Sequence, residues 1–303
     1  MNTLAGHQDV VAGIDGSEAS TAAARWAASV ANAVNSRLIL AHALPQEGPI
    51  YSPAAVMLQS QFLSQIREDG EAIVDAAAAV ISAEFPELTI ESEIAPGPAS
   101  THILESSGTA RLIVMGSTGS GALRSRLLGS TALKVANHAT CPVTVWRGSA
   151  ENPGPDQRPV IVGVDGSALS KKAVEYAFRY ADQFDAPLIA VHTWQGSSTF
   201  REGGAGILID WEAVEQEESA LLAENLAGMA DQYPDVPVTR ISEPGAAAPV
   251  MLKYADDAQL IVVGSHGRSA MAGAVMGSTS QNLLHHAPGP VMICRAGIAV
   301  RLY

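Results

Sequence analysis

Two stretches of the chain share a spacing of glycines and serine that could hold phosphate groups. In each, two residues separate the first two glycines, nine separate the second from the third, and a serine follows at once. Glycines let backbone N–H groups approach phosphate oxygens without a Cβ in the way, and a helix N-terminus attracts negative charge. The pattern therefore predicts two polyphosphate sites. The members of these two glycine grids are Gly116, Gly119, Gly129 and Ser130 in the first and Gly264, Gly267, Gly277 and Ser278 in the second.

An aspartate lies ahead of each grid, directly after an apolar run that reads as a strand. Asp15 follows Gly13 in the first half, and Asp165 follows Gly163 in the second. A carboxylate would repel phosphate but can accept hydrogen bonds from a base or a sugar, and a glycine leaves the strand exit open for a flat ring or a ribose. The alternative is that the aspartates cap helices and the glycines only permit turns. The combination of an aspartate with a grid favours binding.

These residues belong to an internal repeat that covers nearly the whole chain. Asp15 and Asp165 are 150 residues apart, whereas Gly116 and Gly264 are 148 apart, so one module has been duplicated with a net loss of two residues in its middle. The chain of 303 residues is long enough for two domains of ordinary size. The predicted division is a first domain at 1–148, a linker at 149–158, a second domain at 159–297 and a C-terminal tail at 298–303.

Each module alternates strands with helices. Strands joined through helices require right-handed crossover connections and place helices on both faces of a parallel sheet, so the predicted fold class is α/β with two tandem doubly wound domains. The ligand crevice then lies beyond the carboxyl ends of the strands, where Asp15 and Gly116 would form its walls. In the first module we expect strands at 10–14, 38–43, 89–94, 111–115 and 142–146, and helices at 19–34, 64–85, 99–107 and 130–138. The segments 45–56 and 195–210 read as irregular loops.

Composition narrows the possible functions. The formal net charge is −13, with 31 acidic against 18 basic residues, and no basic stripe is visible, so nucleic-acid binding is not expected. No apolar run approaches the roughly 20 residues that span a bilayer, and the first ten residues do not resemble a signal peptide, so we expect a cytoplasmic protein. Cys141 and Cys294 do not align in the repeat and are interpreted as small buried residues, not a disulfide. No Cys/His spacing indicates zinc.

The grids, together with the aspartate after the first strand, resemble the ATP-binding branch of the universal stress proteins in its tandem two-domain form. The resemblance implies a five-stranded parallel sheet of strand order 3-2-1-4-5 in each domain, and ATP, with Mg²⁺, bound in each crevice. It places the base and ribose at the aspartates and the phosphates at the grids. The implied ATP-binding residues are Gly13, Asp15, Gly116, Ser117, Gly119, Ser120, Gly121, Arg126, Gly129 and Ser130, and Gly163, Asp165, Gly264, Ser265, Gly267, Arg268, Gly277, Ser278 and Thr279.

Binding is favoured over catalysis. There is no Walker lysine motif and no carboxylate inside either grid, so the sequence supports slow hydrolysis at most. The expected role is a nucleotide-dependent regulator of stress or dormancy responses. The alternatives are a cyclic-AMP sensor and an enzyme that uses an adenylated intermediate, which would need a Lys or His at the α-phosphate. His266 lies inside the second grid, but Thr118 takes its place in the first; His42 and His192 match each other and are interpreted as packing residues.

The two grids differ within their nine-residue spacers. Arg124 and Arg126 lie in the first spacer, and Arg268 follows Gly267 in the second, so the two sites could bind unequally. The last strands of the modules are apolar and would be exposed sheet edges, which invite pairing. The family commonly dimerises through this strand. We therefore expect a homodimer with intrachain pairing of the two domains, and a protein partner that the sequence does not identify.

Overall fold

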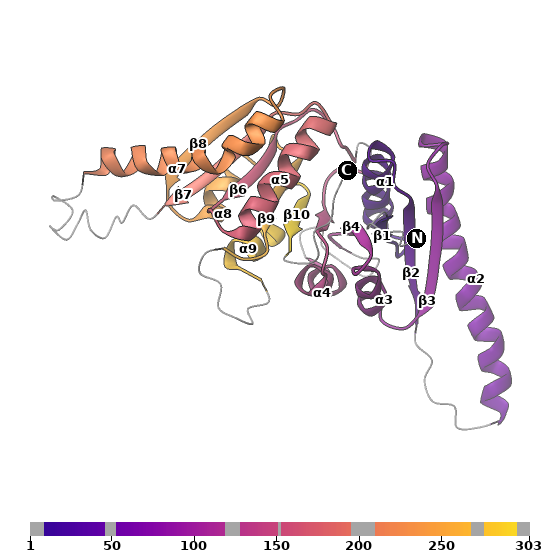
Figure 1. The fold of residues 1–303 in the computed structure, drawn as a ribbon. Helices are drawn as coiled ribbons and strands as arrows, with labels where there is room; N and C mark the ends of the chain where they lie inside the picture. The colour runs from indigo at the N-terminus through magenta and orange to yellow at the C-terminus, as the bar shows by residue number, and fades with distance from the viewer. Residues whose placement is uncertain are drawn as a thin grey trace, which may run out of the picture. The chain divides into compact units, whose positions relative to one another are not determined.

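The computed structural model describes residues 9–45, 53–118, 128–150, 153–194, 210–267 and 276–295, with the side chains of 53–61 left aside. The described chain forms two compact units that divide between Pro155 and Asp156. Each unit is an open parallel sheet with helices on both faces (Figure 1). The predicted α/β class with two tandem doubly wound domains is confirmed.

The first unit contains five parallel strands in the order β3-β2-β1-β4-β5, as the resemblance implied. Helices α1 and α2 pack on each other and cover one face, while α3 and α4 pack on each other and cover the opposite face. The strands are β1 (Asp9–Gly13), β2 (Leu38–Leu44), β3 (Ile90–Pro96), β4 (Ala110–Gly116) and β5 (Val143–Trp146). The helices are α1 (Glu18–Ala33), α2 (Pro53–Glu84), α3 (Ala99–Ser106) and α4 (Ser130–His138).

The second unit repeats this arrangement with the order β8-β7-β6-β9-β10. Helices α5 and α7 lie together on one face, and α8 and α9 lie together on the other. The strands are β6 (Val160–Val164), β7 (Leu188–Trp194), β8 (Val238–Pro244), β9 (Leu260–Gly264) and β10 (Val291–Cys294). The helices are α5 (Ala168–Gln183), α7 (Trp211–Gln232), α8 (Ala247–Leu252) and α9 (Ser278–His286).

The strand sequences explain why the central strands form the core. β1 and β4 lie in the middle of the first sheet, and Val10 and Ile113 on them are fully buried. Strands covered by helices on both faces have near-continuous apolar sequences, as here. The edge strand β3 instead contains only exposed and half-buried residues. The start of α1 is also set by sequence, since Ser17 caps its first turn by accepting a hydrogen bond from the Ser20 N–H at 3.1 Å.

One element boundary was predicted wrongly. Helix α2 begins at Pro53, eleven residues before the predicted start at Ser64, so the part of the expected loop from Pro53 onward is helical. Proline is favoured at the first position of a helix because its missing N–H would have no intrahelical partner there. The loop expected at 195–210 lies outside the described residues, apart from Asp210, which caps α7.

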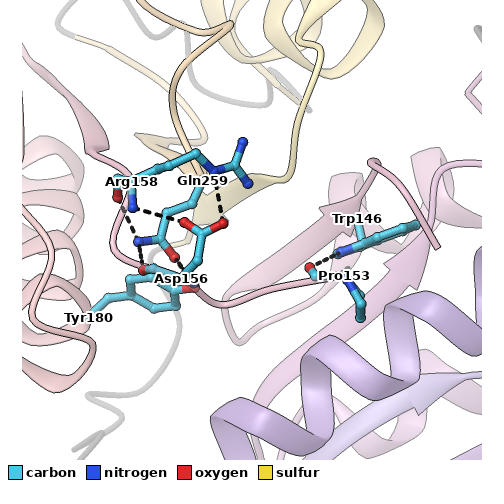
Figure 2. Close-up of polar contacts among 6 residues, drawn as sticks. All are labelled: Trp146, Pro153, Asp156, Arg158, Tyr180 and Gln259. Atoms are coloured by element: carbon cyan, nitrogen blue, oxygen red, sulfur yellow. Dashed lines mark hydrogen bonds and ion pairs between the residues drawn. The ribbon is translucent and has the colours of Figure 1, made fainter. Parts of the chain in front are cut away.

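The described part of the segment between the units is held by side chains at both of its ends (Figure 2). In the first unit, the Trp146 indole Nε1–H donates to the Pro153 carbonyl at 3.1 Å. In the second unit, the buried Gln259 side-chain oxygen accepts from the Asp156 N–H at 3.0 Å, while its amide group donates to the carbonyls of Asp156 and Arg158. Each end is therefore attached to the unit that it adjoins.

Both cysteines are buried thiols, as expected. Burial raises the pKa of the Cys141 thiol to about 12 and also raises the pKa of Cys294, because an apolar surrounding disfavours the thiolate. Among the described residues, no helix is both long enough and apolar enough to cross a membrane.

Candidate functional site

Each unit has a cavity at the carboxyl ends of its central strands. In the first unit this cavity has a volume of about 310 Å³ and lies among the ends of β1, β2 and β4 and the first turn of α4. The strand order changes direction between β1 and β4, and open α/β sheets bind ligands at such a point. The cavity therefore lies where the sequence predicted the crevice. The predicted site residues that line it are Gly13, Asp15, Gly116, Gly129 and Ser130.

Asp15 is held in place by the loop that follows β1. Its Oδ1 accepts hydrogen bonds from the Ser17 backbone N–H at 3.0 Å and from the Ser17 hydroxyl at 2.6 Å. Ser17 in turn caps α1, so the aspartate supports the helix start through Ser17. Asp165 repeats the contact in the second unit, where its Oδ1 accepts from the Ser167 N–H at 2.9 Å. The aspartates thus organise the loop and line the cavity at once, so the two interpretations of their role are compatible.

The ends of each glycine grid are joined by one backbone hydrogen bond. The Gly129 N–H donates to the Ser117 carbonyl at 2.7 Å, and the Gly277 N–H donates to the Ser265 carbonyl at 2.7 Å. The third glycine therefore uses its own N–H to close the loop and does not offer it to a ligand. The free donors of the first turn come from the residues after the glycine.

The helices that start at the grids have no capping side chain. Gly129 and Gly277 occupy the N-cap positions of α4 and α9, and neither helix has a side-chain cap hydrogen bond, in contrast to α1. The first turn of a helix contains N–H groups that lack intrahelical acceptors, and its dipole favours an anion. The first turns of α4 and α9 line the two cavities. One end of each cavity is therefore formed by an uncapped helix N-terminus.

The second cavity is larger, at about 710 Å³, and contains the predicted residues Gly163, Asp165, Gly264, Gly267, Gly277, Ser278 and Thr279. Its walls show why one grid position suits glycine. A Cβ on Gly267 would come within 2.5 Å of Asp165 Oδ2, closer than side chains approach one another. The absence of a side chain at Gly267 thus lets the grid loop approach the aspartate.

Two groups of predicted residues lie elsewhere. Ser117 and Ser265 are buried beneath the grids, where their N–H groups donate to the carbonyls of Trp146 and Cys294 at 2.9 and 2.8 Å. These serines support the loops from the sheet side. The predicted residues Gly119, Ser120, Gly121, Arg126 and Arg268, together with Arg124, lie outside the described residues.

Neither cavity has a lysine or arginine in its lining, as far as the described part of the chain reaches. The described residues also contain no cluster of three or more His, Cys, Asp or Glu side chains that could hold a metal ion. The space over Gly13 is taken by Met115, since a Cβ on that glycine would meet the Met115 sulfur at 2.7 Å. The described walls therefore offer backbone N–H groups and helix ends to an anion.

Sequence reasoning missed several cavity residues. His42 and His102 line the first cavity, and Trp194 and Glu218 line the second. The two matched histidines make the same contact in each unit. Nδ1 of His42 lies 2.8 Å from the Ile14 carbonyl, and Nδ1 of His192 lies 2.7 Å from the Val164 carbonyl. His192 is buried and also contacts Glu218. Because His42 and His192 lie in apolar runs, the sequence predicts only that they pack in the core and carries no sign of their hydrogen bonds.

Comparisons with known proteins agree with the geometry in both units. The model of the universal stress protein family matches residues 6–147 and again 157–295. A universal stress protein of Mycobacterium tuberculosis is 36% identical over 291 residues, which cover 94% of this chain and 96% of that protein. A universal stress protein of Mycolicibacterium smegmatis is 34% identical over 292 residues, covering 94% and 96%.

A solved structure shares the fold. The crystal structure of a universal stress protein from Archaeoglobus fulgidus superposes with a TM-score of 0.70 and covers 98% of this chain and 99% of that chain. The sequence identity is 19%, so this likeness concerns the fold alone.

Proposed function

Because the chain belongs to the universal stress protein family and carries two of its domains in tandem, we propose that it binds one ATP in each cavity and acts as a nucleotide-dependent regulator. The observation that carries this proposal is the pair of uncapped helix N-termini, those of α4 and α9, which line the two cavities. A polyphosphate supplies the acceptors that a capping side chain would otherwise give. Gly129 and Gly277, at the N-cap positions, add no side chain beside these N–H groups.

The rest of each cavity suits the remainder of a nucleotide. Asp15 and Asp165 are fixed at the ends of β1 and β6 and can accept hydrogen bonds from ribose hydroxyls or from a base. Mg²⁺ bound with the nucleotide would rely largely on phosphate oxygens, and it supplies charge neutralisation there.

We favour binding over turnover as the main activity. Phosphoryl transfer requires a cation for the transferred group and a residue that orients the nucleophile. The described lining of each cavity contains a helix terminus and one aspartate near the strand end, but no lysine or arginine. A bound nucleotide would then act through the shape of the loops around it, with hydrolysis slow at most.

A matched pair of substitutions tests the proposal. Ser130 and Ser278 are exposed first residues of α4 and α9, so a glutamate is tolerated by the helix but places a carboxylate where the phosphates would bind. Native mass spectrometry and calorimetry with ATP and Mg²⁺ should give two ATP per chain for the unmodified protein. Ser130→Glu and Ser278→Glu should each give one, and the double variant none.

The same protein preparations distinguish the alternatives. Acid extraction of the freshly purified protein, followed by mass spectrometry, identifies any nucleotide that purifies with it. Cyclic AMP in place of ATP would redirect the proposal toward second-messenger sensing. Absence of any nucleotide, both in the extract and in titration of the unmodified protein, would overturn it.

A further inference from the structure

The two cavities differ at the end that lies away from the glycine grids. Strand β7 is separated from β9 by β6, so the carboxyl end of β7 is two strand spacings, about 10 Å, from the strand that leads into the second grid. Trp194 ends β7 and lines the cavity there, together with Glu218 of α7. If phosphates occupy the grid end, the base of a nucleotide extends toward these two side chains.

The first unit has neither of these side chains. Trp194 corresponds to Leu44 at the offset of 150 residues that relates β2 to β7. Glu218 corresponds to Gly70 at the offset of 148 residues, which also relates the last residues of α2 and α7. Gly70 packs so closely that a Cβ there would come within 2.5 Å of Leu44 Cδ2 and 3.1 Å of the His42 ring. The first unit therefore closes the space in which the second unit places a carboxylate.

Glu218 is a positioned hydrogen-bond acceptor. Its Oε2 lies 2.8 Å from His192 Nε2, and the other ring nitrogen of His192 lies 2.7 Å from the Val164 carbonyl. The Val164 carbonyl oxygen can only accept, so the His192 Nδ1–H donates to it, and Nε2 lies toward the Glu218 carboxylate. His192 is buried, and the pair thus fixes the orientation of the carboxylate. Among the described residues, the second oxygen of Glu218 has no hydrogen-bond partner and is available to a ligand.

Trp194 supplies an independent observation. Trp194 is only 9% exposed, and its indole Nε1–H is buried without an acceptor among the described residues. Its ring lies nearly parallel to that of Trp211, with ring centroids 6.2 Å apart. A buried donor without a partner is unfavourable, and a ligand acceptor would remove that penalty. The lining of the second cavity therefore includes one residue with a fixed acceptor and one aromatic residue whose N–H donor is unpaired among the described residues.

We propose that Glu218 and Trp194 make the second cavity selective for an aminopurine base, whereas the first cavity lacks this pair of side chains and selects the base less strongly. Glu218 accepts a hydrogen from the exocyclic amino group, and the Trp194 N–H donates to a neighbouring ring nitrogen. An adjacent donor and acceptor on one edge are what distinguish an aminopurine from an unsubstituted purine. This proposal rests on the proposed function, since it assumes that nucleotide phosphates lie at the grids.

The test compares ATP with purine riboside triphosphate, which has the same sugar and phosphates but lacks the amino group. The Ser130→Glu protein reports the second cavity alone, and the Ser278→Glu protein reports the first. A hydrogen bond to a charged group predicts that the second cavity binds ATP at least about tenfold more tightly than the analogue. The first cavity should distinguish the two ligands by less than about threefold, because it lacks both side chains.

Substitutions assign the effect to individual residues. In the Ser130→Glu protein, Glu218→Ala should reduce the preference for ATP to that of the first cavity. Glu217→Ala is the matched control, since Glu217 is exposed on the same helix and should leave the preference unchanged. Trp194→Phe keeps an aromatic ring but removes the N–H, and it should lower ATP affinity at the second cavity several-fold. It provides a second route if Glu218→Ala unfolds, as judged by circular dichroism.

The outcomes separate the two proposals. If the unmodified protein binds ATP at neither cavity, the proposed function fails and the selectivity of the second cavity fails with it. If both cavities bind ATP but the second does not prefer it over purine riboside triphosphate, the selectivity alone is overturned. It is also overturned if the preference for ATP survives both Glu218→Ala and Trp194→Phe.

Discussion

The two halves of the chain agree at the grid end of their cavities and differ at the opposite end. The bond from the third grid glycine to the serine carbonyl has the same length, 2.7 Å, in both units, and both following helices lack a capping side chain. At the other end, the first unit has Leu44 and Gly70 where the second has Trp194 and Glu218. The grid end depends on backbone geometry, whereas the opposite end depends on side chains, so a duplicated module can change its specificity at one end and keep the other.

The largest expected effect concerns whether the halves are independent folding units. Ile113 and Ile261 occupy equivalent positions on β4 and β9 and are 0% and 1% exposed. Replacing either with alanine leaves a cavity in the centre of its sheet, so each substitution should destabilise its own unit by about 2–5 kcal/mol. Hydrogen exchange measured by mass spectrometry would locate the loss of protection in one unit at a time.

The pair also provides its own control. If Ile113→Ala lowered protection from hydrogen exchange equally in both units, the two halves would unfold together. The two cavities could then not be compared as independent sites. Confinement of each effect to its own unit would support treating the cavities separately. Nucleotide binding at the unaltered unit should then stay within about twofold, since distant sites are close to additive.

The sequence located several of the residues that line the two cavities. The spacing of the glycines, with Asp15 and Asp165, identified both cavities, because only a few residue types permit such close approach of loop and helix. The apolar runs around Val10 and Ile113 identified the central strands, because strands buried on both faces rarely carry polar residues. The order of the strands followed from the family resemblance and was confirmed.

The rest depended on contacts between elements distant in sequence. Glu218 and His192 meet because α7 packs across the end of β7, and the change of repeat offset from 150 to 148 between them hides the correspondence of Glu218 with Gly70. The hydrogen bond that occupies the Gly129 N–H could not be predicted either, since its acceptor, the Ser117 carbonyl, is set by how the loop closes. The early start of α2 was missed because the segment 45–56 is rich in Gly, Pro and Ser, which is typical of a loop.

A smaller effect is expected from the residues that hold the segment between the units (Figure 2). Gln259 is 2% exposed and binds Asp156, Arg158 and the Tyr180 hydroxyl, the last at 3.2 Å. Gln259→Ala would leave several polar groups without partners, so it should destabilise the second unit by about 1–3 kcal/mol. In the first unit the segment is held by the bond from Trp146 to the Pro153 carbonyl and by the bond from Arg25 to the Ala150 carbonyl at 2.7 Å. Trp146→Phe removes only the first of these and should cost about 1 kcal/mol.

Denaturant titration of the two variants, followed by hydrogen exchange, measures this asymmetry. Equal destabilisation by Gln259→Ala and Trp146→Phe would mean that the extra contacts of Gln259 contribute nothing net. A larger effect for Gln259→Ala, with lost protection around Asp156, would show that the second unit holds its end of the segment more firmly.

The smallest expected effect concerns the serine caps that both units share at the start of α1 and α5. Ser17 and Ser167 cap α1 and α5, each accepting from a serine N–H three residues on at 3.1 Å, and each donates its own N–H to the preceding aspartate. Either serine replaced by alanine should cost about 1 kcal/mol, because a cap acceptor is lost. The two caps differ in one hydrogen bond of the described loops: the Ser17 hydroxyl also donates to Asp15 Oδ1, at 2.6 Å.

Ser17→Ala should therefore weaken ATP binding in the first cavity more than Ser167→Ala does in the second, by a factor of about two to five. The physical reason is that Ser17→Ala removes the hydroxyl that donates to Asp15 Oδ1 at 2.6 Å in addition to the helix cap, so the Asp15 carboxylate is less firmly oriented. Calorimetry on the single-site Ser278→Glu and Ser130→Glu proteins measures each loss separately. Equal losses in the two cavities would show that the hydroxyl contact does not help to position Asp15.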